Sequence, residues 1–296
     1  MTTSTAAHLR QLIRDPGAPI VLPGAANALT ASLIQEAGFD AVYVTGAGVT
    51  NTFLGLPDLG LLTLDELAEH VAAMTDVVDL PFVVDADTGF GNAINVQRTV
   101  HRLERAGAAA IQLEDQVSPK RCGHFGGKQV VSGAEMVGKI HAALDARRQD
   151  TLIIARTDAL ATHGLGEACE RASAYLDAGA EIIFVEAPVT IEEMRQIIQQ
   201  VPGSHIANMV EGGNTPRLSR AQLGELGFAI ALYANSAMRG AVAGTRQVLS
   251  HLAQHADTLE ADDLMISWDD RQALVHKPHF DELERRYAET DKSSSG

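Results

Sequence analysis

One local pattern recurs four times along the chain: an amphipathic helical stretch ends at a glycine, and a run of β-forming apolar residues follows at once. The glycines of this pattern are Gly38, Gly107, Gly179 and Gly227. Glycine ends a helix readily because it adopts a left-handed backbone conformation without the steric cost of a Cβ atom. The runs that follow are continuously apolar rather than alternating, which is typical of strands that are covered on both faces in a parallel sheet.

Further apolar runs bring the number of candidate strands to eight, and helical stretches alternate with them. The candidate strands cover residues 20–22, 41–44, 82–85, 110–113, 152–155, 182–185, 205–208 and 230–233. Eight strand–helix units in about 250 residues match the size of a TIM barrel. A doubly wound open sheet is the alternative, but the first strand leads into residues 22–27, which contain no G-x-G-x-x-G turn.

We therefore predict an α/β fold, a (β/α)₈ TIM barrel that forms the catalytic domain over residues 1–250. Residues 251–296 are expected to form a C-terminal helical extension of the same domain. This extension exceeds what a barrel needs, so we expect its helices to pack on another subunit. Its last residues, 291–296, are polar and are expected to form a flexible tip.

The charge balance of the chain limits the partners it can bind. Lys and Arg total 23 against 38 Asp and Glu, a formal net charge of −15. This excess of negative charge argues against nucleic acid and against an anionic membrane surface. The two cysteines, Cys122 and Cys169, are too few for a disulfide scaffold. Without a signal-like start or an apolar run of membrane-spanning length, the chain is expected to be cytoplasmic.

Charged and amide side chains gather where the predicted strands end. They are Asp85, Asp87, Glu114, Arg156, Glu186 and Asn208, with Asp58 in the second loop. The carboxyl ends of the strands form the active site of a TIM barrel, and like charges there need a cation to neutralise them. We predict that Asp58, Asp85, Asp87 and Glu114 form a Mg²⁺ site, with Mn²⁺ as a substitute. The alternative is that each carboxylate caps the helix that follows it.

The loop after the fourth predicted strand contains Cys122 beside Lys120, Arg121 and His124. An isolated cysteine is more often a small buried apolar residue, but cationic neighbours lower the pKa of a thiol and make it reactive. The glycines of this loop fit a lid that carries an acid or base to a site. Cys169 has no such neighbours and is expected to be structural.

Together these residues resemble the isocitrate lyase / phosphoenolpyruvate mutase superfamily over residues 23–243. The matching motifs occupy residues 45–48, 55–58, 85–91, 112–115, 120–124, 155–159, 186–188 and 207–213. The sequence Lys-Arg-Cys-Gly-His at 120–124 is similar to the lyase branch. The resemblance implies a Mg²⁺-dependent barrel and a homotetramer, a dimer of dimers whose C-terminal helices are exchanged.

The resemblance implies a carbon–carbon lyase that acts on a small dicarboxylate. We expect retro-Claisen cleavage of a substituted 2-hydroxy dicarboxylate, similar to 2,3-dimethylmalate, to a 2-oxo acid such as pyruvate and a carboxylic acid. Phe125 and the pair Gly212-Gly213 favour such a substrate over a tricarboxylate. The alternatives are a methylisocitrate lyase, which forms pyruvate and succinate, and an oxaloacetate hydrolase. A Schiff-base aldolase and a non-enzymic barrel are weaker hypotheses.

The same resemblance suggests a role for each site residue. Asp85 would bind Mg²⁺ directly, and Asp58, Asp87 and Glu114 would hold its waters. Cys122 would protonate the carbanion, and Arg156, His124 and Glu186 would complete the catalytic set. The expected substrate-binding residues are Tyr43, Thr45, Gly46, Ala47, Gly123, Asn208 and Gly212, with the backbone N–H groups of Thr45, Gly46 and Ala47 binding a carboxylate.

Overall fold

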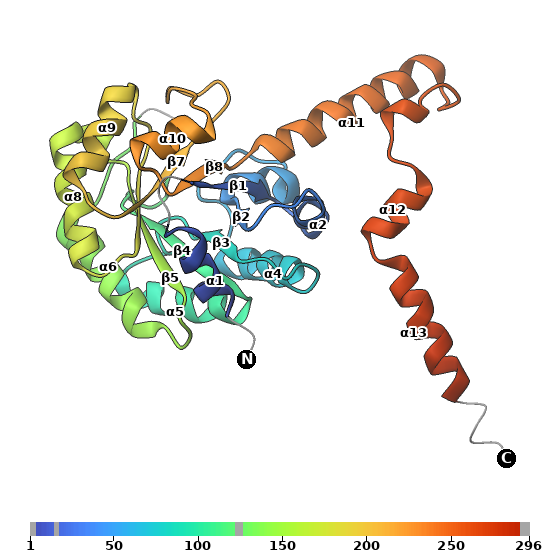
Figure 1. Cartoon of the computed structure of the whole chain (residues 1–296), viewed down its shortest axis with the longest axis horizontal. Coiled ribbons are helices and arrows are strands. Elements are labelled where there is room, and N and C mark those ends of the chain that lie inside the picture. The colour runs from blue at the N-terminus through green and yellow to red at the C-terminus, as the bar shows by residue number, and fades with distance from the viewer. Residues whose placement is uncertain (1–3, 15–17, 122–126, 291–296) are drawn as a thin grey trace. The chain divides into compact units, whose positions relative to one another are not determined.

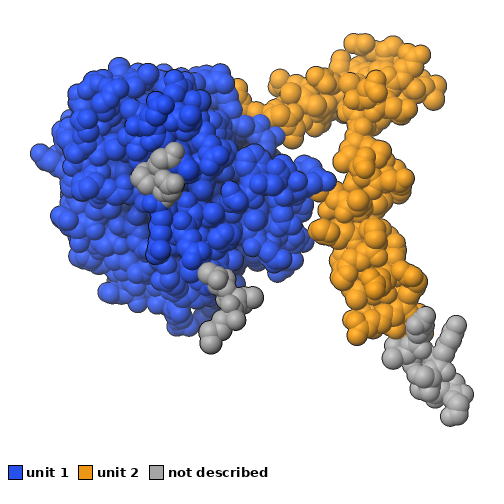
Figure 2. All heavy atoms as spheres, in the orientation of Figure 1, with its two compact units in different colours: residues 1–238 blue, residues 239–296 orange. Residues whose placement is uncertain are grey.

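The computed structural model describes residues 4–14, 18–121 and 127–290 of the 296-residue chain (Figure 1). The chain divides into two compact units, Met1–Met238 and Arg239–Gly296 (Figure 2). In unit 1, eight parallel strands form a closed barrel in which each strand pairs with the next and β8 pairs with β1. The strands are β1 Ile20–Ala25, β2 Val42–Val44, β3 Phe82–Asp85, β4 Ala108–Glu114, β5 Leu152–Thr157, β6 Ile182–Val185, β7 Ser204–Asn208 and β8 Ile230–Tyr233. The predicted TIM barrel is confirmed.

Helices surround the barrel and follow the strands in the expected alternation. The helices of unit 1 are α1 Thr5–Leu12, α2 Ala28–Glu36, α3 Gly46–Val49, α4 Leu64–Thr75, α5 Ala93–Arg105, α6 Gly133–Ala146, α7 Ala159–His163, α8 Leu165–Asp177, α9 Ile191–Gln200 and α10 Arg220–Leu226, with a π-helix at Thr50–Leu54. The four glycines that follow α2, α5, α8 and α10 within two residues all have positive φ angles: Gly38, Gly107, Gly179 and Gly227. This confirms their predicted role as helix stops.

Apolar side chains fill the barrel interior at the end where the strands begin. A single buried cluster contains residues from all eight strands, among them Leu22, Val83 and Ile154, together with Leu9 and Ile13 near the N-terminus. Helix α1, which the sequence analysis did not predict, therefore packs against the strand starts. The carboxyl ends of the strands are left for the site. There the strand register places Asp85 opposite Gln112 and Glu114 opposite Arg156.

The C-terminal part is helical, as expected. It contains α11 Ser236–His255, a short 3₁₀ helix Asp262–Leu264, α12 Trp268–Leu274 and α13 Lys277–Thr290. Helix α11 begins in unit 1 and continues into unit 2, and none of its residues is buried. Large apolar side chains of unit 2, including Leu249, Trp268 and Phe280, are exposed. Within the described ranges, no helix has both the length and the hydropathy needed to cross a membrane.

Gly24 offers a direct test of how the barrel closes. A Cβ atom at this β1 position would lie 1.9 Å from the carbonyl oxygen of Ala234. Backbone must move to relieve such an overlap, so we expect Gly24→Ala to lower the free energy of unfolding by about 1–3 kcal/mol. The matched control is Gly138→Ala in α6, where a Cβ meets nothing within 4 Å. This change should raise stability by up to about 1 kcal/mol. Urea unfolding followed by circular dichroism measures both, and equal stabilities would contradict the packing described at the β1–β8 seam.

Candidate active site

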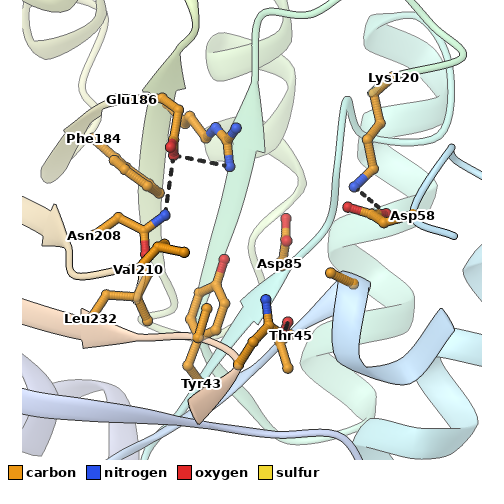
Figure 3. A pocket seen from close by; sticks show the side chains of 14 residues that line it. Tyr43, Thr45, Asp58, Asp85, Lys120, Phe184, Glu186, Asn208, Val210 and Leu232 are labelled. Atoms are coloured by element: carbon orange, nitrogen blue, oxygen red, sulfur yellow. Dashed lines mark hydrogen bonds and ion pairs between the residues drawn. The ribbon is translucent and has the colours of Figure 1, made fainter. Parts of the chain in front are cut away.

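A cavity of about 480 Å³, including the part that opens to solvent, lies at the carboxyl ends of the strands (Figure 3). Its walls come from loops and strand ends all around the barrel. The lining residues are Tyr43, Thr45, Ala47, Asp58, Asp85, Lys120, Arg156, Phe184, Glu186, Asn208, Val210, Leu232, Ala234 and Asn235. Many of the residues expected at the site from sequence therefore meet in one place.

The other expected site residues divide into three groups. Asp87, Glu114 and Gly46 lie next to lining residues without lining the cavity themselves. Gly212 is exposed in the loop after β7 and is not among the lining residues. Cys122, Gly123 and His124 lie outside the described residues, so their roles stay predictions.

Tyr43, Gln112 and Asp85 form a buried chain of hydrogen bonds beneath the cavity. The Tyr43 hydroxyl donates to Gln112 Oε1 at 3.1 Å, and Gln112 Nε2 donates to Asp85 Oδ1 at 3.1 Å. Burial raises the pKa of Tyr43 well above its ordinary value, and the charge of Asp85 adds to this rise. Tyr43 therefore stays protonated and serves as a donor that helps to fix Asp85.

The loop after β3 holds Asp87 in an unusual conformation. The φ angle of Asp87 is 48°, in the left-handed region that costs a non-glycine residue energy. Behind it, the buried Lys139 of α6 donates to the Thr88 carbonyl at 3.0 Å, and the Thr99 hydroxyl donates to the Gly89 carbonyl at 3.0 Å. These bonds stabilise the loop and keep the Asp87 carboxylate beside Asp85.

Lys120 pairs with two of the predicted metal carboxylates. Its Nζ lies 2.5 Å from Asp58 Oδ1 and 3.0 Å from Asp87 Oδ1, and its side chain is 5% exposed. Burial lowers the pKa of Lys120, but the nearby carboxylates outweigh that effect, so the pKa is raised. A Schiff base requires a neutral amine, and the Lys120 ammonium does not favour that chemistry. In the sequence Lys120 lies two residues from Cys122, and nothing there indicates its pairing with Asp58 and Asp87.

Arg156, at the end of β5, is buried among three carboxylates. Its Nε lies 2.9 Å from Asp158 Oδ2 and 3.3 Å from Glu114 Oε2, and its Nη1 lies 3.5 Å from Glu186 Oε2. Asn208 Nδ2 donates to the same Glu186 oxygen at 3.4 Å (Figure 3). The guanidinium also lies over the Phe184 ring, 5.1 Å from its centroid. This arrangement holds a fixed cation at the cavity wall.

The backbone N–H and the hydroxyl of Thr45 both make contacts within the protein, whereas the N–H was predicted to bind a substrate carboxylate. Its backbone N–H donates to the Ala25 carbonyl at 3.3 Å and is therefore engaged in the barrel. The Thr45 hydroxyl caps α3 by accepting from Gly48 N–H, and it donates to Asn235 Oδ1 at 3.1 Å. The expectation that Thr45 N–H binds a carboxylate is thus wrong. At a helix start, the first N–H groups have no intrahelical partner, which leaves those of Gly46 and Ala47 for this role.

The donor set next to Asp85 fits a divalent cation. Burial raises the pKa of Asp87 to about 7; Lys120 opposes this rise, and the charges of Asp85 and Asp58 increase it. In the part of the chain that the structure describes, the buried Glu114 Oε1 has no hydrogen-bond partner. A Cβ at Gly46 would lie 3.4 Å from both Asp85 Oδ2 and Asp87 Oδ1, so glycine keeps the space beside these oxygens open. Such carboxylates are short of positive charge, which a metal ion supplies.

The described residues do not form a closed metal cage. Among them, no three His, Cys, Asp or Glu side chains converge closely enough to hold an ion directly. Mg²⁺ does not require such a cage, because it usually keeps several waters and binds through one or two carboxylates. The arrangement therefore fits one direct carboxylate ligand with others further out.

Opposite Lys120 and Asp58, the cavity has an apolar wall. Figure 3 shows Phe184, Val210 and Leu232 together on one side, with Lys120 and Asp58 on the other. Asn208 and Glu186 lie on the same side as the apolar groups (Figure 3). A ligand in this cavity thus meets Lys120 and Asp58 on one flank, and hydrocarbon together with the Asn208 amide and the Glu186 carboxylate on the other.

Comparison with known proteins identifies the family. The model of the phosphoenolpyruvate phosphomutase family matches residues 9–253. The chain belongs to this family, the phosphoenolpyruvate mutase/isocitrate lyase superfamily. It is 46% identical to the 2,3-dimethylmalate lyase of Eubacterium barkeri over 96% of this chain and 99% of that protein. It is 43% identical to the 2-methylisocitrate lyase of Aeropyrum pernix over 97% of this chain and 91% of that protein.

Solved structures of the superfamily share the whole fold. A crystal structure of 2,3-dimethylmalate lyase aligns with a TM-score of 0.91 and 35% identity, covering 97% of this chain and 96% of that chain. A phosphonopyruvate hydrolase in complex with oxalate and Mg²⁺ aligns with a TM-score of 0.87 and 31% identity, covering 97% of this chain and 100% of that chain. The resemblance found in the sequence is confirmed, and the chain is an enzyme of this superfamily, with named lyases among its relatives.

Proposed function

We propose that this enzyme is a carbon–carbon lyase that cleaves a substituted 2-hydroxy dicarboxylate, similar to 2,3-dimethylmalate, to a 2-oxo acid such as pyruvate and a carboxylic acid. The observation that carries this proposal is the two-sided cavity. Its charged lining groups, among them Lys120 and Arg156, suit two carboxylates and a hydroxyl, and its apolar wall of Phe184, Val210 and Leu232 suits alkyl substituents. Unsubstituted polar acids would leave this wall without a partner.

The carboxylates around Asp85 are proposed to hold Mg²⁺, with Mn²⁺ as a substitute. Asp85 would bind the ion, and Asp58, Asp87 and Glu114 would hold its waters. The bound ion supplies Lewis acidity that lowers the pKa of the substrate hydroxyl. A related phosphonopyruvate hydrolase that binds Mg²⁺ with oxalate supports this assignment.

The residues of the chain divide the remaining work between the two ends of the substrate. The N–H groups of Gly46 and Ala47 bind the carboxylate of the nascent 2-oxo acid. When the C2 hydroxyl loses its proton to solvent water and the C2–C3 bond breaks, Arg156, held by buried carboxylates, stabilises the negative charge that develops on the other product. Cys122 donates a proton to the carbanionic carbon, as the resemblance implies, and Gly123 and His124 follow it in the sequence. Asn208 and Glu186 orient the substrate next to Arg156.

Two other activities of the same site remain as alternatives. A methylisocitrate lyase would need a cation for a third carboxylate, and an oxaloacetate hydrolase would act on a substrate without alkyl groups. Val210 and Leu232 favour the alkyl-substituted dicarboxylate over both. Assays on each substrate distinguish the three.

We expect activity to depend on the metal. Excess EDTA should abolish turnover, and Mg²⁺ or Mn²⁺ should restore it. Asp85→Ala should remove activity because the direct ligand is lost, whereas Asp87→Ala should chiefly weaken Mg²⁺ binding, by about 10- to 100-fold, because a water-mediated contact is easier to replace. Calorimetric titration with Mg²⁺ measures the affinities. Full turnover in excess chelator would rule out this mechanism.

We expect the dicarboxylate 2,3-dimethylmalate to exceed 2-methylisocitrate in kcat/KM by about 10- to 100-fold. A missing charge-assisted hydrogen bond to the third carboxylate costs about 1.5–3 kcal/mol. Release of pyruvate, followed with lactate dehydrogenase, measures both reactions under the same conditions. If methylisocitrate is the better substrate, the alternative activity replaces the proposed one.

We expect Cys122→Ser to lower kcat by about 10²- to 10⁴-fold, because a serine hydroxyl is a far weaker acid than a thiol. The matched control is Cys169→Ser. Cys169 is buried in α8, and burial raises the pKa of its thiol. This change should lower stability and leave kcat unchanged. Unimpaired kcat in Cys122→Ser would remove the general acid from the mechanism.

We also propose that the enzyme is a homotetramer, a dimer of dimers that exchange their C-terminal helices. Apolar side chains are exposed in each unit: Phe53 and Leu56 in unit 1, and Trp268 and Phe280 in unit 2. Exposed apolar groups of this number are typical of surfaces that another subunit covers. Light scattering should give a tetramer, and Trp268→Asp with Phe280→Asp should dissociate it. A fully active monomer would contradict the proposal.

A further inference from the structure

The carboxylate of Asp158 grips one edge of the Arg156 guanidinium. Arg156 Nε donates to Asp158 Oδ2 at 2.9 Å, and Arg156 Nη2 donates to Asp158 Oδ1 at 3.2 Å. Such a bidentate pair fixes the plane of the guanidinium as well as its position. The Phe184 ring also packs against the flat face of the guanidinium. Asp158 therefore holds one edge of the group, and Phe184 holds its face. Its remaining Nη1 is the atom nearest Glu186, at the cavity.

Asp158 does not cap the helix that it precedes, although its position is that of a capping residue. It occupies the N-cap position of α7, where an aspartate usually accepts a backbone N–H of the helix. Here its side chain makes no capping bond. Both oxygens bind cations instead, since Lys128 Nζ also donates to Asp158 Oδ1 at 2.6 Å. The Thr157 hydroxyl accepts the N–H of Ala159 in its place, at 3.1 Å.

Asp115 holds Asp158 from behind. Its Oδ1 accepts the backbone N–H of Asp158 at 2.9 Å, and its Oδ2 accepts the Thr157 hydroxyl at 2.7 Å. The same Oδ2 accepts the Tyr175 hydroxyl at 2.8 Å and Arg171 Nη1 at 3.3 Å, both from α8. Asp115 is fully buried, so this carboxylate is stable there only because several donors satisfy it.

We propose that Asp158 and Asp115 are positioning residues for Arg156: Asp158 orients the guanidinium toward the cavity, and Asp115 fixes the end of β5 that carries Asp158. This inference rests on the proposed function, in which Arg156 stabilises charge during bond cleavage. Neither aspartate lines the cavity, so both act through Arg156 rather than on the substrate. A preorganised cation does not have to reorient as charge develops, which is why its orientation affects the rate.

The central test is Asp158→Asn, which keeps the shape of the side chain. An amide offers an N–H where two cations need acceptors, so the bidentate grip is lost. We expect kcat to fall about 10- to 100-fold, with a smaller change in KM. In an Arg156→Lys background, where no bidentate pair exists, the same change should lower kcat less than twofold. Such non-additivity shows that Asp158 acts through Arg156. If Asp158 had a merely structural role, the fold-losses in kcat of the two single variants would multiply in the double variant.

Tyr175→Phe tests the outer contact. It removes one of the donors to Asp115 from helix α8, and we expect a two- to fivefold lower kcat. The matched control is Glu104→Gln, a buried carboxylate that accepts the backbone N–H groups of Arg148 and Gln149 near the strand starts. This control should lower stability and leave kcat unchanged. An equal loss of kcat in Glu104→Gln would show that general destabilisation explains the effect and would overturn the proposal.

The test also separates this inference from the proposed function. If the wild-type enzyme cleaves 2,3-dimethylmalate and folded Asp158→Asn does so equally well, only the positioning role is wrong. If the wild type cleaves no 2-hydroxy dicarboxylate, the proposed function is wrong, and positioning is then read from calorimetric binding of 2,3-dimethylsuccinate, which lacks the hydroxyl and cannot be cleaved. The positioning role is supported if Asp158→Asn weakens this binding in the chain that has Arg156 but not in the Arg156→Lys variant. Equal binding by all variants overturns it.

Discussion

The burial of like charges at one end of the barrel is the constraint on which the site depends. Six carboxylates at this end are largely buried. The exposed fraction of the side chain is 13% or less for Asp58, Asp87, Glu114, Glu186 and Asp158, and Asp85 is 8% exposed. Lys120, Arg156 and Lys128 pair with members of this set. Among the described residues, six carboxylates thus face three cations in a poorly solvated place, and burial together with neighbouring carboxylates raises the pKa of Asp87 and of Glu114. A divalent cation would remove that cost, which would link metal binding to the stability of the site.

The fold places the buried charges and the apolar barrel core at opposite ends of the strands. Helix α1 and the apolar interior occupy the end where strands begin, and the charged groups occupy the end where strands stop. The loops there are fixed by buried bonds from surrounding helices: Lys139 of α6 holds the loop of Asp87, and Tyr175 of α8 holds Asp115. The outer helices therefore stabilise the geometry of groups that they do not bring to the cavity.

The sequence was sufficient to predict the barrel because each strand and each glycine stop is a local feature. The carboxylates at the strand ends could also be predicted, because all parallel strands point the same way. Pairings between loops could not, because they depend on side-chain direction in space. Lys120 with Asp58 is one example, and the use of the Thr45 N–H by Ala25 is another. Asp158 is a further example: it occupies the N-cap position of α7, and only its contacts in space show that its side chain binds Arg156 and Lys128 instead.

The apolar wall was also missed, since Phe184, Val210 and Leu232 come from strands and a loop whose sequences look like ordinary core. In the proposed function, this wall contacts the alkyl substituents of the substrate. The most direct test is to follow 2,3-dimethylmalate with the enzyme and Mg²⁺ in D₂O by proton NMR. The mechanism predicts pyruvate and propionate in equal amounts, with one deuterium at C2 of propionate from the exchanged acid. Unchanged substrate, or propionate without that deuterium, would contradict it.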